Sequence, residues 1–326
     1  MRILVTGGSG FIGTALVPRL LSLGHEVVVL TRKSSRVAPG IAVASWDPAT
    51  GKFQRDVLAG VDAVVHLAGA GIADKRWTNS RRAAILNSRV DSTRLLVSAM
   101  QEAGTPPQVF VSASAIGFYG DTGDDVHDET SGSGDGFAAE VCRAWEASAT
   151  VRGPAGAAEA ASAAASTAEA ASATAAGVPT RTAFLRFGTV LDPAGGALAR
   201  MLPLFRLGLG GRLGSGRQWM SCISREDAIA AIVEALGNEA LNGPVNVVAP
   251  DPIRNADFTR ALASGLGKRV GPPVPGLALR AVYGRMAKEL LLGSSRVVPR
   301  VLTEAGFEFR HPDIVAYLEQ LHSGRQ

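Results

Sequence analysis

The sequence has very little cysteine and no cluster of metal-binding side chains. Cys142 and Cys222 are its two cysteines, far apart in 326 residues, which excludes a disulfide framework and a Cys-x-x-Cys metal site. The five histidines form no pair at short helical spacing, so we expect no histidine-held metal centre of the hydrolase kind. Free thiols suit a reducing compartment, and we expect the cytoplasm.

Long apolar runs and a strong charge excess are also missing. No segment holds 18 or more apolar residues without polar ones, and the N-terminus enters a strand at once, so we expect neither a membrane partner nor a signal peptide. Lys and Arg number 33 against 29 Asp and Glu, without basic runs interleaved with aromatics, so we expect no nucleic-acid partner. With 46% hydrophobic residues, the chain can form a large globular core.

Glycine, by contrast, is abundant, and three glycines fall in one informative place. A β-branched run at Arg2–Thr6 leads into a glycine turn, an amphipathic helix follows, and a second apolar run occupies Glu26–Leu30. This order is that of a dinucleotide-binding βαβ unit, in which free amides at the helix start bind a pyrophosphate. An ordinary βα turn is the alternative. The candidate contacts are Gly7, Gly10, Phe11, Ile12 and Gly13.

The residues after the second apolar run indicate which dinucleotide binds. An acidic residue there would bind the ribose 2′-hydroxyl of NAD, but the chain has Thr31, Arg32 and Lys33. Their cations would attract a 2′-phosphate, which favours NADP over NAD. The alternative is an ordinary solvated strand end.

Several segments carry a resemblance to a known family. The glycine turn, together with His66-Leu67-Ala68-Gly69-Ala70, resembles the extended short-chain dehydrogenase/reductase family. Four more segments resemble its divergent epimerase-like branch, often labelled sugar-nucleotide epimerase or SulA-like: Ser112–Gly120, Phe137–Glu146, Gly214–Ser221 and Gly306–Arg310. The resemblance implies an α/β Rossmann fold with a doubly wound parallel sheet, NADP(H), and a small, mostly helical C-terminal substrate lobe. It implies no particular substrate.

Two strand ends offer further candidate cofactor contacts. Asp47 follows the strand predicted at Ile41–Ser45, where the resemblance implies an acidic contact to the adenine amine, although a turn carboxylate before Pro48 is equally expected. Leu67 ends a nearly continuous apolar strand, and the residues after it are small enough for backbone to pack on a cofactor. These small residues are Ala68, Gly69 and Ala70.

A basic helix follows, predicted from Thr78 to Ala103. Arg89 on this helix occupies the place where the resemblance implies an asparagine, and we count it among the candidate cofactor contacts. If Arg89 or Arg76 faces the cleft, it would attract an anionic group of a small-molecule substrate. The remaining arginines of this helix are expected to face water.

The resemblance also implies a Tyr-x-x-x-Lys pair for proton transfer, and this chain lacks it. Phe137 occupies the tyrosine place and Val141 the lysine place, and neither side chain can transfer a proton. The candidate catalytic residues lie beyond the strand predicted at Gln108–Val111, and they are Ser112, Ser114 and Tyr119. Ser114 matches the family's serine, and it or Tyr119 could give a hydrogen bond to a developing oxyanion.

We divide the chain into an NADP-binding domain at 1–190 and a substrate lobe at 191–326. An alanine-rich insertion occupies 151–176, a strand is predicted at Arg181–Leu191, and part of 221–250 is expected to return to the sheet. Two functions are open: an NADP-dependent oxidoreductase or epimerase-like enzyme with an unusual acid/base arrangement, and a cofactor-bound regulatory protein without turnover. Monomer and homodimer are both open.

Overall fold

The computed structural model describes residues 1–103, 105–149 and 180–322. At its centre, eight strands form one sheet in the order β11-β7-β6-β5-β1-β2-β3-β4, in which β4 alone runs antiparallel to its neighbour. This is the doubly wound, Rossmann-type sheet that the sequence predicts. Its strands are β1 (Arg2–Thr6), β2 (Glu26–Thr31), β3 (Ala42–Asp47), β4 (Lys52–Phe53), β5 (Ala63–His66), β6 (Val109–Ala115), β7 (Arg181–Phe187) and β11 (Gly243–Val247).

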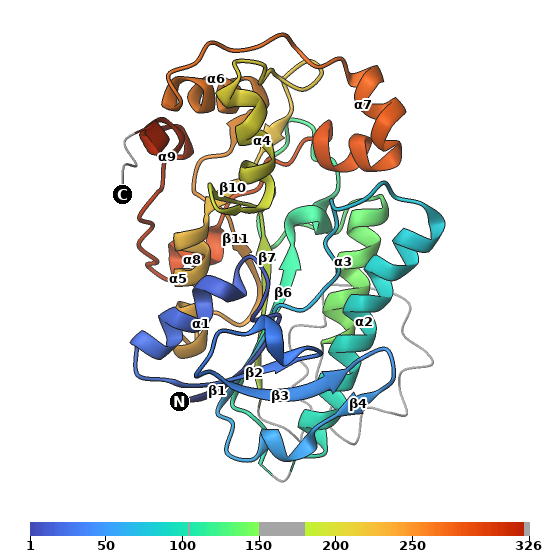
Figure 1. The fold of residues 1–326 in the computed structure, drawn as a ribbon, viewed down its shortest axis with the longest axis vertical. Coiled ribbons are helices and arrows are strands. Elements are labelled where there is room, and N and C mark those ends of the chain that lie inside the picture. The colour runs from blue at the N-terminus through green and yellow to red at the C-terminus, as the bar shows by residue number, and fades with distance from the viewer. Residues whose placement is uncertain (104, 150–179, 323–326) are drawn as a thin grey trace.

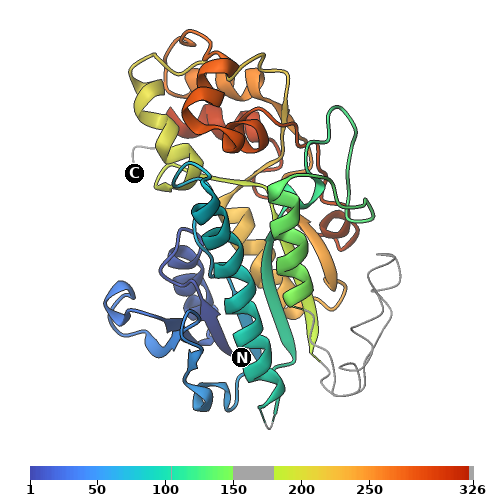
Figure 2. The same ribbon diagram turned by 90° about the vertical axis from the view of Figure 1, so that its right-hand side faces the viewer.

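Helices cover both faces of the sheet (Figures 1 and 2). The helices α1 (Gly13–Ser22), α5 (Arg225–Gly237) and α8 (Arg300–Glu304) lie on one face, and α2 (Asn79–Gln101) and α3 (Phe137–Ser148) lie on the other. Successive residues of β1 point to opposite faces of the sheet. Ile3 and Val5 pack on the side of α1, and Leu4 packs on the side of α2. All three are fully buried. Burying each contributes about 1.5–3 kcal/mol.

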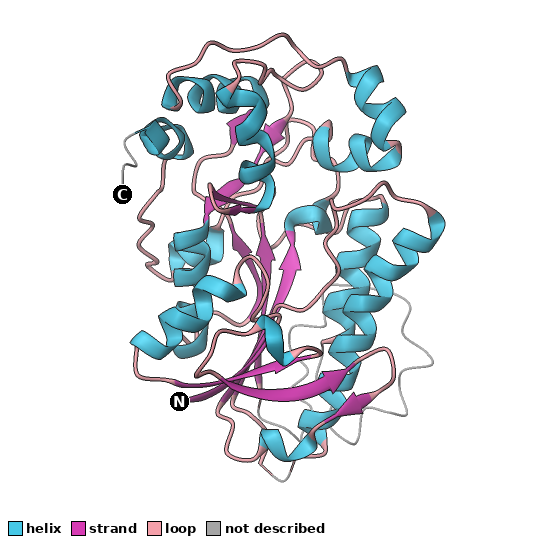
Figure 3. Cartoon of the chain, in the orientation of Figure 1, coloured by secondary structure: helices cyan, strands magenta, loops and turns pink. Residues whose placement is uncertain are grey.

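A helical lobe stands beyond the carboxyl ends of the strands (Figures 1 and 3). Its apolar core joins Leu198 and Phe205 to Phe258 and Leu318. The lobe contains α4 (Gly196–Arg206), α6 (Asn255–Gly265), α7 (Gly276–Tyr283), the π-helical turn η5 (Ala287–Leu291) and α9 (Ile314–Glu319). Two small sheets pair β8 (Thr189–Asp192) with β10 (Cys222–Ser224) and β9 (Trp219–Met220) with β12 (Ile253–Arg254). The 3-10 turns are η1 (Ser34–Arg36), η2 (Arg55–Leu58), η3 (Ile116–Tyr119) and η6 (Gln320–His322).

Two predicted strand boundaries are wrong. The strand predicted to end at Val111 continues to Ala115, because β6 stays paired with β7 along its whole length, so Ser112 and Ser114 lie within the strand. The single strand predicted at Arg181–Leu191 is broken at Gly188 into β7 and β8, which belong to different sheets. A Cβ on Gly188 would lie 2.4 Å from the carbonyl oxygen of Ser221, so glycine permits the crossing there.

Part of the later chain returns to the main sheet. β11 adds a strand beyond β7, and it lies within the stretch 221–250 that we expected to return. The division at residue 190 stays a prediction. The alanine-rich insertion at 151–176 lies outside the described residues.

Candidate nucleotide-binding and active site

The glycine turn between β1 and α1 has no room for side chains. Gly7 has a φ of 71°, and a Cβ there would lie 2.7 Å from the carbonyl carbon of Leu67. A Cβ on Gly13 would lie 2.3 Å from the carbonyl oxygen of Gly7. Glycine at these positions therefore lets α1 start directly against β1 and the loop after β5.

The start of α1 presents unused backbone donors. The amide of Gly10 donates to Gly7 (2.8 Å), but the amides of Phe11, Ile12 and Gly13 donate to no described residue. No side chain caps the helix, and its first turn has no acidic residue. These donors and the positive end of the helix dipole suit an anion such as a pyrophosphate.

The side chain of Phe11 has a separate, structural role. Its ring lies against Gly195 and Gly196 at the start of α4, where a Cβ on Gly195 would be 2.4 Å from the ring. The guanidinium of Arg225 lies 5.2 Å from the ring centroid and pairs with Asp192 at 3.0 Å. Phe11 therefore joins the turn to α4, which leaves its amide for a ligand.

The end of β2 carries exposed cations. Thr31 shapes the turn, because its Oγ1 accepts from the amide of Lys33 and donates to the carbonyl of Lys33, both at 3.2 Å. Arg32, Lys33 and also Arg36, from the turn η1, are exposed, and none forms an ion pair with a described residue. Sequence reasoning missed Arg36, although its spacing of three from Lys33 in a serine-rich turn was a usable signal.

Asp47 is engaged in its own turn. Its Oδ1 accepts from the amide of Ala49 at 3.2 Å, and its Oδ2 accepts from the hydroxyl of Thr50 at 3.0 Å. This is the turn carboxylate that the sequence left open as the alternative. The adenine contact stays a prediction.

The loop after β5 is held from both sides. The amide of Ala68 donates to Thr6 Oγ1 (3.3 Å) and the amide of Ala70 donates to Ser88 Oγ (3.0 Å), while Gly69 is exposed. From α2, Arg89 Nη1 donates to the carbonyl of Ala70 at 2.9 Å.

Arg89 itself is largely enclosed. Its guanidinium lies 4.8 Å from the ring centroid of Trp145, and a Cβ on Gly69 would be 3.3 Å from its Cζ. Burial lowers the pKa of Arg89. The contacts of Arg89 with described residues support the loop, and its contact with a cofactor stays a prediction.

His66, at the end of β5, is a core residue. Its Nδ1 bonds to Thr6 Oγ1 at 2.6 Å, and its Nε2 bonds to Thr93 Oγ1 at 3.0 Å. Burial, and secondarily the charge of Arg89, lowers the pKa of His66 to about 3. The imidazole is therefore neutral at physiological pH and holds β1, β5 and α2 together.

A buried polar network links the carboxyl ends of β6 and β7. Ser114 Oγ donates to Glu146 Oε1 at 2.6 Å, and Arg186 forms a two-point ion pair with Glu146, with both bonds at 2.8 Å. Arg186 Nη1 also donates to the hydroxyl of Tyr119 at 2.9 Å, and that hydroxyl donates to Asn246 Oδ1 at 2.8 Å. The hydrogen bonds therefore run without a break from Ser114 through Glu146, Arg186 and Tyr119 to Asn246.

This network changes the expectation for the three candidate catalytic hydroxyls. Tyr119 is 2% exposed, and burial raises its pKa to about 12, so it keeps its proton at neutral pH. Ser112 is 1% exposed, with a weak contact of 3.4 Å to the carbonyl of Ala113. Of the three, Ser114 alone bonds directly to a carboxylate, that of Glu146.

The two residues at the Tyr-x-x-x-Lys places pack in an apolar cluster. Phe137 and Val141 are both buried, and the Phe137 ring meets Trp77 edge to face at 4.9 Å, with Met286 in the same cluster. Next to them, Cys142 Sγ lies 3.4 Å from the carbonyl oxygen of Ala115, and burial raises its thiol pKa to about 12. Phe137, Val141 and Cys142 therefore offer no group that titrates near neutral pH.

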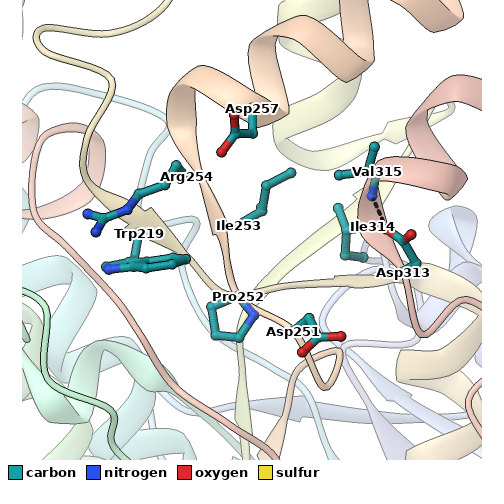
Figure 4. Close-up of a pocket in the computed structure, with 9 residues that line it drawn as sticks. All are labelled: Trp219, Asp251, Pro252, Ile253, Arg254, Asp257, Asp313, Ile314 and Val315. Atoms are coloured by element: carbon teal, nitrogen blue, oxygen red, sulfur yellow. Dashed lines mark hydrogen bonds between the residues drawn. The ribbon is translucent and has the colours of Figure 1, made fainter.

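A hollow of about 270 Å³ lies apart from these groups, in the helical lobe (Figure 4). Trp219 forms one side, with Arg254 at 3.9 Å and Arg296 at 4.5 Å from its ring centroid, and its Nε1 donates to Asp124 at 3.0 Å. Asp313, on the other side, caps α9. Because these polar groups are already partnered, we assign no ligand to the hollow.

Two absences apply to the residues that the structure describes. None of their helices combines the length and apolar character that crossing a bilayer would require. No three of their His, Cys, Asp or Glu side chains are grouped so as to hold a metal ion.

Comparison with known proteins identifies the family. The model of the NAD dependent epimerase/dehydratase family matches residues 3–140, and a domain of unknown function, DUF1731, matches residues 274–321. An epimerase family protein of Mycobacterium tuberculosis is 38% identical over 310 residues, covering 95% of this chain and 94% of that protein. The chain belongs to this epimerase family. The resemblance stated from the sequence is confirmed.

Solved structures of epimerase family members share the fold. The human epimerase family protein SDR39U1, crystallised with NADPH, is 33% identical, with a TM-score of 0.84 over 99% of this chain and 100% of that one. A nucleoside-diphosphate sugar epimerase from Corynebacterium glutamicum is 34% identical, with a TM-score of 0.73 over 99% of this chain and 58% of that one.

Proposed function

We propose that this epimerase family member binds NADP(H) at the β1–α1 turn and acts on a small molecule as an oxidoreductase or epimerase-like enzyme. The proposal is supported by two features that would bind the two phosphate-bearing parts of the same nucleotide. Unused amides lie at the start of α1, and unpaired cations lie at the end of the neighbouring strand β2. The human relative crystallised with NADPH supports the choice of cofactor.

The residues present fit a dinucleotide. A Cβ on Gly7 would fill the space beside Leu67, and the amides of Phe11 and Ile12 are free to receive a pyrophosphate. Arg32 and Lys33 would hold the 2′-phosphate, with Arg36 as a third cation. The two free, buried cysteines support a reducing compartment such as the cytoplasm.

Bound NADP supplies the hydride chemistry, and the chain must supply proton transfer. In this proposal, Ser114 accepts the proton of a substrate hydroxyl while it passes its own proton to Glu146, 2.6 Å away. Arg186 fixes the carboxylate of Glu146 through its two-point ion pair. The pair Ser114 and Glu146 would thus replace the missing Tyr-x-x-x-Lys pair.

Calorimetry on one charge change tests the cofactor. We expect Arg32→Asp to weaken NADPH binding at least tenfold more than NADH binding, since only NADPH offers a 2′-phosphate to the lost cation. The exposed Arg19, in α1, provides a matched control, and Arg19→Asp should leave both affinities unchanged. Equal losses for the two nucleotides in Arg32→Asp would refute the phosphate contact.

A second variant tests the chemistry. Turnover is sought as a change of NADPH absorbance with small carbonyl compounds, and as formation of the epimer from sugar nucleotides, because epimerisation regenerates the cofactor. We expect Ser114→Ala to abolish turnover while the NADPH affinity is kept, whereas Ser148→Ala, on the helix of Glu146, keeps both. Unchanged kcat in Ser114→Ala would remove Ser114 and the proposed relay from the mechanism.

One observation favours a second function, an NADP-binding regulatory or interaction protein without turnover. Phe137 and Val141 fill the places of the proton-transfer pair with packed apolar side chains. In that case we expect the protein to bind NADPH and to turn over none of the compounds tested. Ser114→Ala should then change the stability of the protein and leave its NADPH affinity as it is.

A further inference from the structure

Two stretches of the later chain contain basic residues and no acidic ones. Residues 193–225 and 258–288 contain 11 Lys and Arg and no Asp or Glu. Since the whole chain has 33 basic and 29 acidic residues, the remainder carries 22 basic against 29 acidic. The overall excess of four therefore includes two basic stretches without acidic residues, which end next to Asp192, Glu226, Asp257 and Glu289.

Parts of the two acid-free stretches lie side by side in the lobe. The amide of Gly271 donates to the carbonyl of Gly210 at 2.8 Å, and the amide of Val274 donates to the carbonyl of Arg212 at 2.9 Å. These bonds join the loop after α4 to the loop that enters α7, in the part of the lobe that lies away from β4 (Figure 1). We call this region, residues 204–212 and 268–283, the basic end.

The basic end also exposes large aliphatic side chains. The five most exposed large hydrophobic residues of the described chain all belong to it, led by Leu277 at 80% and Leu207 at 72%. The other three are Val282, Leu204 and Leu209. Isolated exposed leucines are ordinary, but a concentration on two adjoining segments marks a contact surface.

Four cations stand among these side chains without a carboxylate partner. They are exposed, and none forms an ion pair with a described residue, whereas Arg260 and Arg285 of the same stretches pair with Asp257 and Glu289. The four are Arg206, Lys268, Arg269 and Arg280.

We propose that the basic end is a peripheral docking surface for an anionic lipid bilayer. Aliphatic side chains that protrude beside unpaired cations match a membrane interface, where leucines enter below the headgroups and cations meet lipid phosphates. The expectation of no membrane partner rested on the lack of a spanning segment, and a peripheral contact needs none. The proposal is independent of nucleotide binding at the β1–α1 turn.

Charge and side-chain type favour lipid over other occupants. A second copy docked by a two-fold axis would bring the same unpaired cations together, and neither acid-free stretch offers a carboxylate to neutralise them. A single-stranded nucleic acid would call for stacking aromatics, whereas the exposed groups here are mainly aliphatic, with Tyr283 the one exposed aromatic in the basic end.

Vesicle cosedimentation of the full chain tests the proposal. We expect binding to phosphatidylcholine vesicles containing about 30% phosphatidylglycerol, weakened by salt, and little binding to pure phosphatidylcholine. Leu207→Ser with Leu277→Ser should weaken binding at least about tenfold. Lys268→Gln with Arg269→Gln should weaken it about thirtyfold. The control, Leu21→Ser with Leu23→Ser, removes two exposed leucines at the end of α1 and should bind like the parent.

Three outcomes would overturn the proposal. The first is that the protein does not bind anionic vesicles although it retains its NADPH affinity. Retained NADPH affinity would show that the protein is folded. The second is loss of binding in the α1 control as large as in the lobe variants. The third is a dimer, detected by light scattering, that Leu207→Ser with Leu277→Ser dissociates, since the surface would then be an interface between copies.

Discussion

The β1–α1 turn and the carboxyl ends of β6 and β7 lie at the same edge of one sheet, yet they treat polar groups in opposite ways. The turn leaves the amides of Phe11 and Ile12 without described partners. At β6 and β7, Ser114, Tyr119 and Arg186 are buried. Ser114 and Arg186 both donate to Glu146, and Arg186 also donates to the hydroxyl of Tyr119. The first region thus presents backbone donors without described partners, whereas the second presents side chains that are bonded to one another.

The two regions depend on the sequence to different degrees. Backbone amides and glycines bind a nucleotide without any particular side chain, so this function tolerates divergence elsewhere. Proton transfer depends on specific side chains, and the places where the resemblance implies the Tyr-x-x-x-Lys pair hold Phe137 and Val141. The buried ion pair of Glu146 and Arg186 now organises that region.

Removing one member of the buried network gives the largest expected effect. Glu146→Ala leaves the guanidinium of Arg186, of which 5% of the side chain is exposed, without its carboxylate. The expected loss of unfolding free energy is about 3–5 kcal/mol, measured by urea denaturation. Glu304→Ala, which removes one of the two ion-pair partners of the exposed Arg300, should cost less than about 1 kcal/mol. Similar losses in both variants would mean that the buried pair is not special.

At the turn, the next largest effect comes from filling its space. Gly7→Ala places a Cβ 2.7 Å from the backbone of Leu67 at a φ of 71°, and we expect a loss of about 2–4 kcal/mol together with loss of NADPH binding. Gly24 has a φ of 81° with nothing within 4 Å of a Cβ, so Gly24→Ala isolates the backbone strain. It should cost about 1–2 kcal/mol and retain NADPH binding by calorimetry.

How far the sequence could predict these two regions follows from their chain separation. The turn is local, since its glycines, helix and strand lie within 31 residues of the N-terminus, and local order fixed its interpretation. The network joins Glu146 to Arg186 and Tyr119 to Asn246, which lie 40 and 127 residues apart. No pattern of neighbouring residues in the sequence predicts such distant partners. A polar residue in each of two largely apolar strands, Arg186 and Asn246, did indicate that a buried polar contact was present.

The same limit applies to strand ends and to the basic end. Gly188 breaks a strand because Ser221 crosses it, which only the tertiary structure reveals. The acid-free stretches are visible in the sequence, but their adjacency depends on the bonds between Gly271 and Gly210 and between Val274 and Arg212.

His66 lies between the two regions, and its neutrality predicts a pH dependence. Its pKa is lowered to about 3 in the folded protein, so below about pH 6.5 the unfolded chain takes up a proton that the folded chain does not. The contribution of His66 to the free energy of unfolding is therefore fully present above about pH 6.5 and is lost as the pH is lowered toward 3. The slope is about 1.4 kcal/mol per pH unit, or about 2 kcal/mol between pH 6.5 and 5.

Urea midpoints at several pH values measure this effect. His66→Gln lacks the titrating group, so its stability should fall less steeply between pH 6.5 and 5, whatever its absolute stability. Parallel curves for the parent and His66→Gln would show that another group is responsible.

The smallest expected effect distinguishes the two interpretations of Asp47. Both of its oxygens accept bonds from Ala49 and Thr50 in the turn, so Asp47→Ala should lower the free energy of unfolding by about 0.5–1.5 kcal/mol. If the carboxylate serves the turn alone, the Kd of NADPH stays within about twofold of the parent. A tenfold weaker Kd, with NADH weakened equally, would instead assign Asp47 to the adenine that both nucleotides share. That result would extend the open, ligand-receiving region from the glycine turn across β2 to the end of β3.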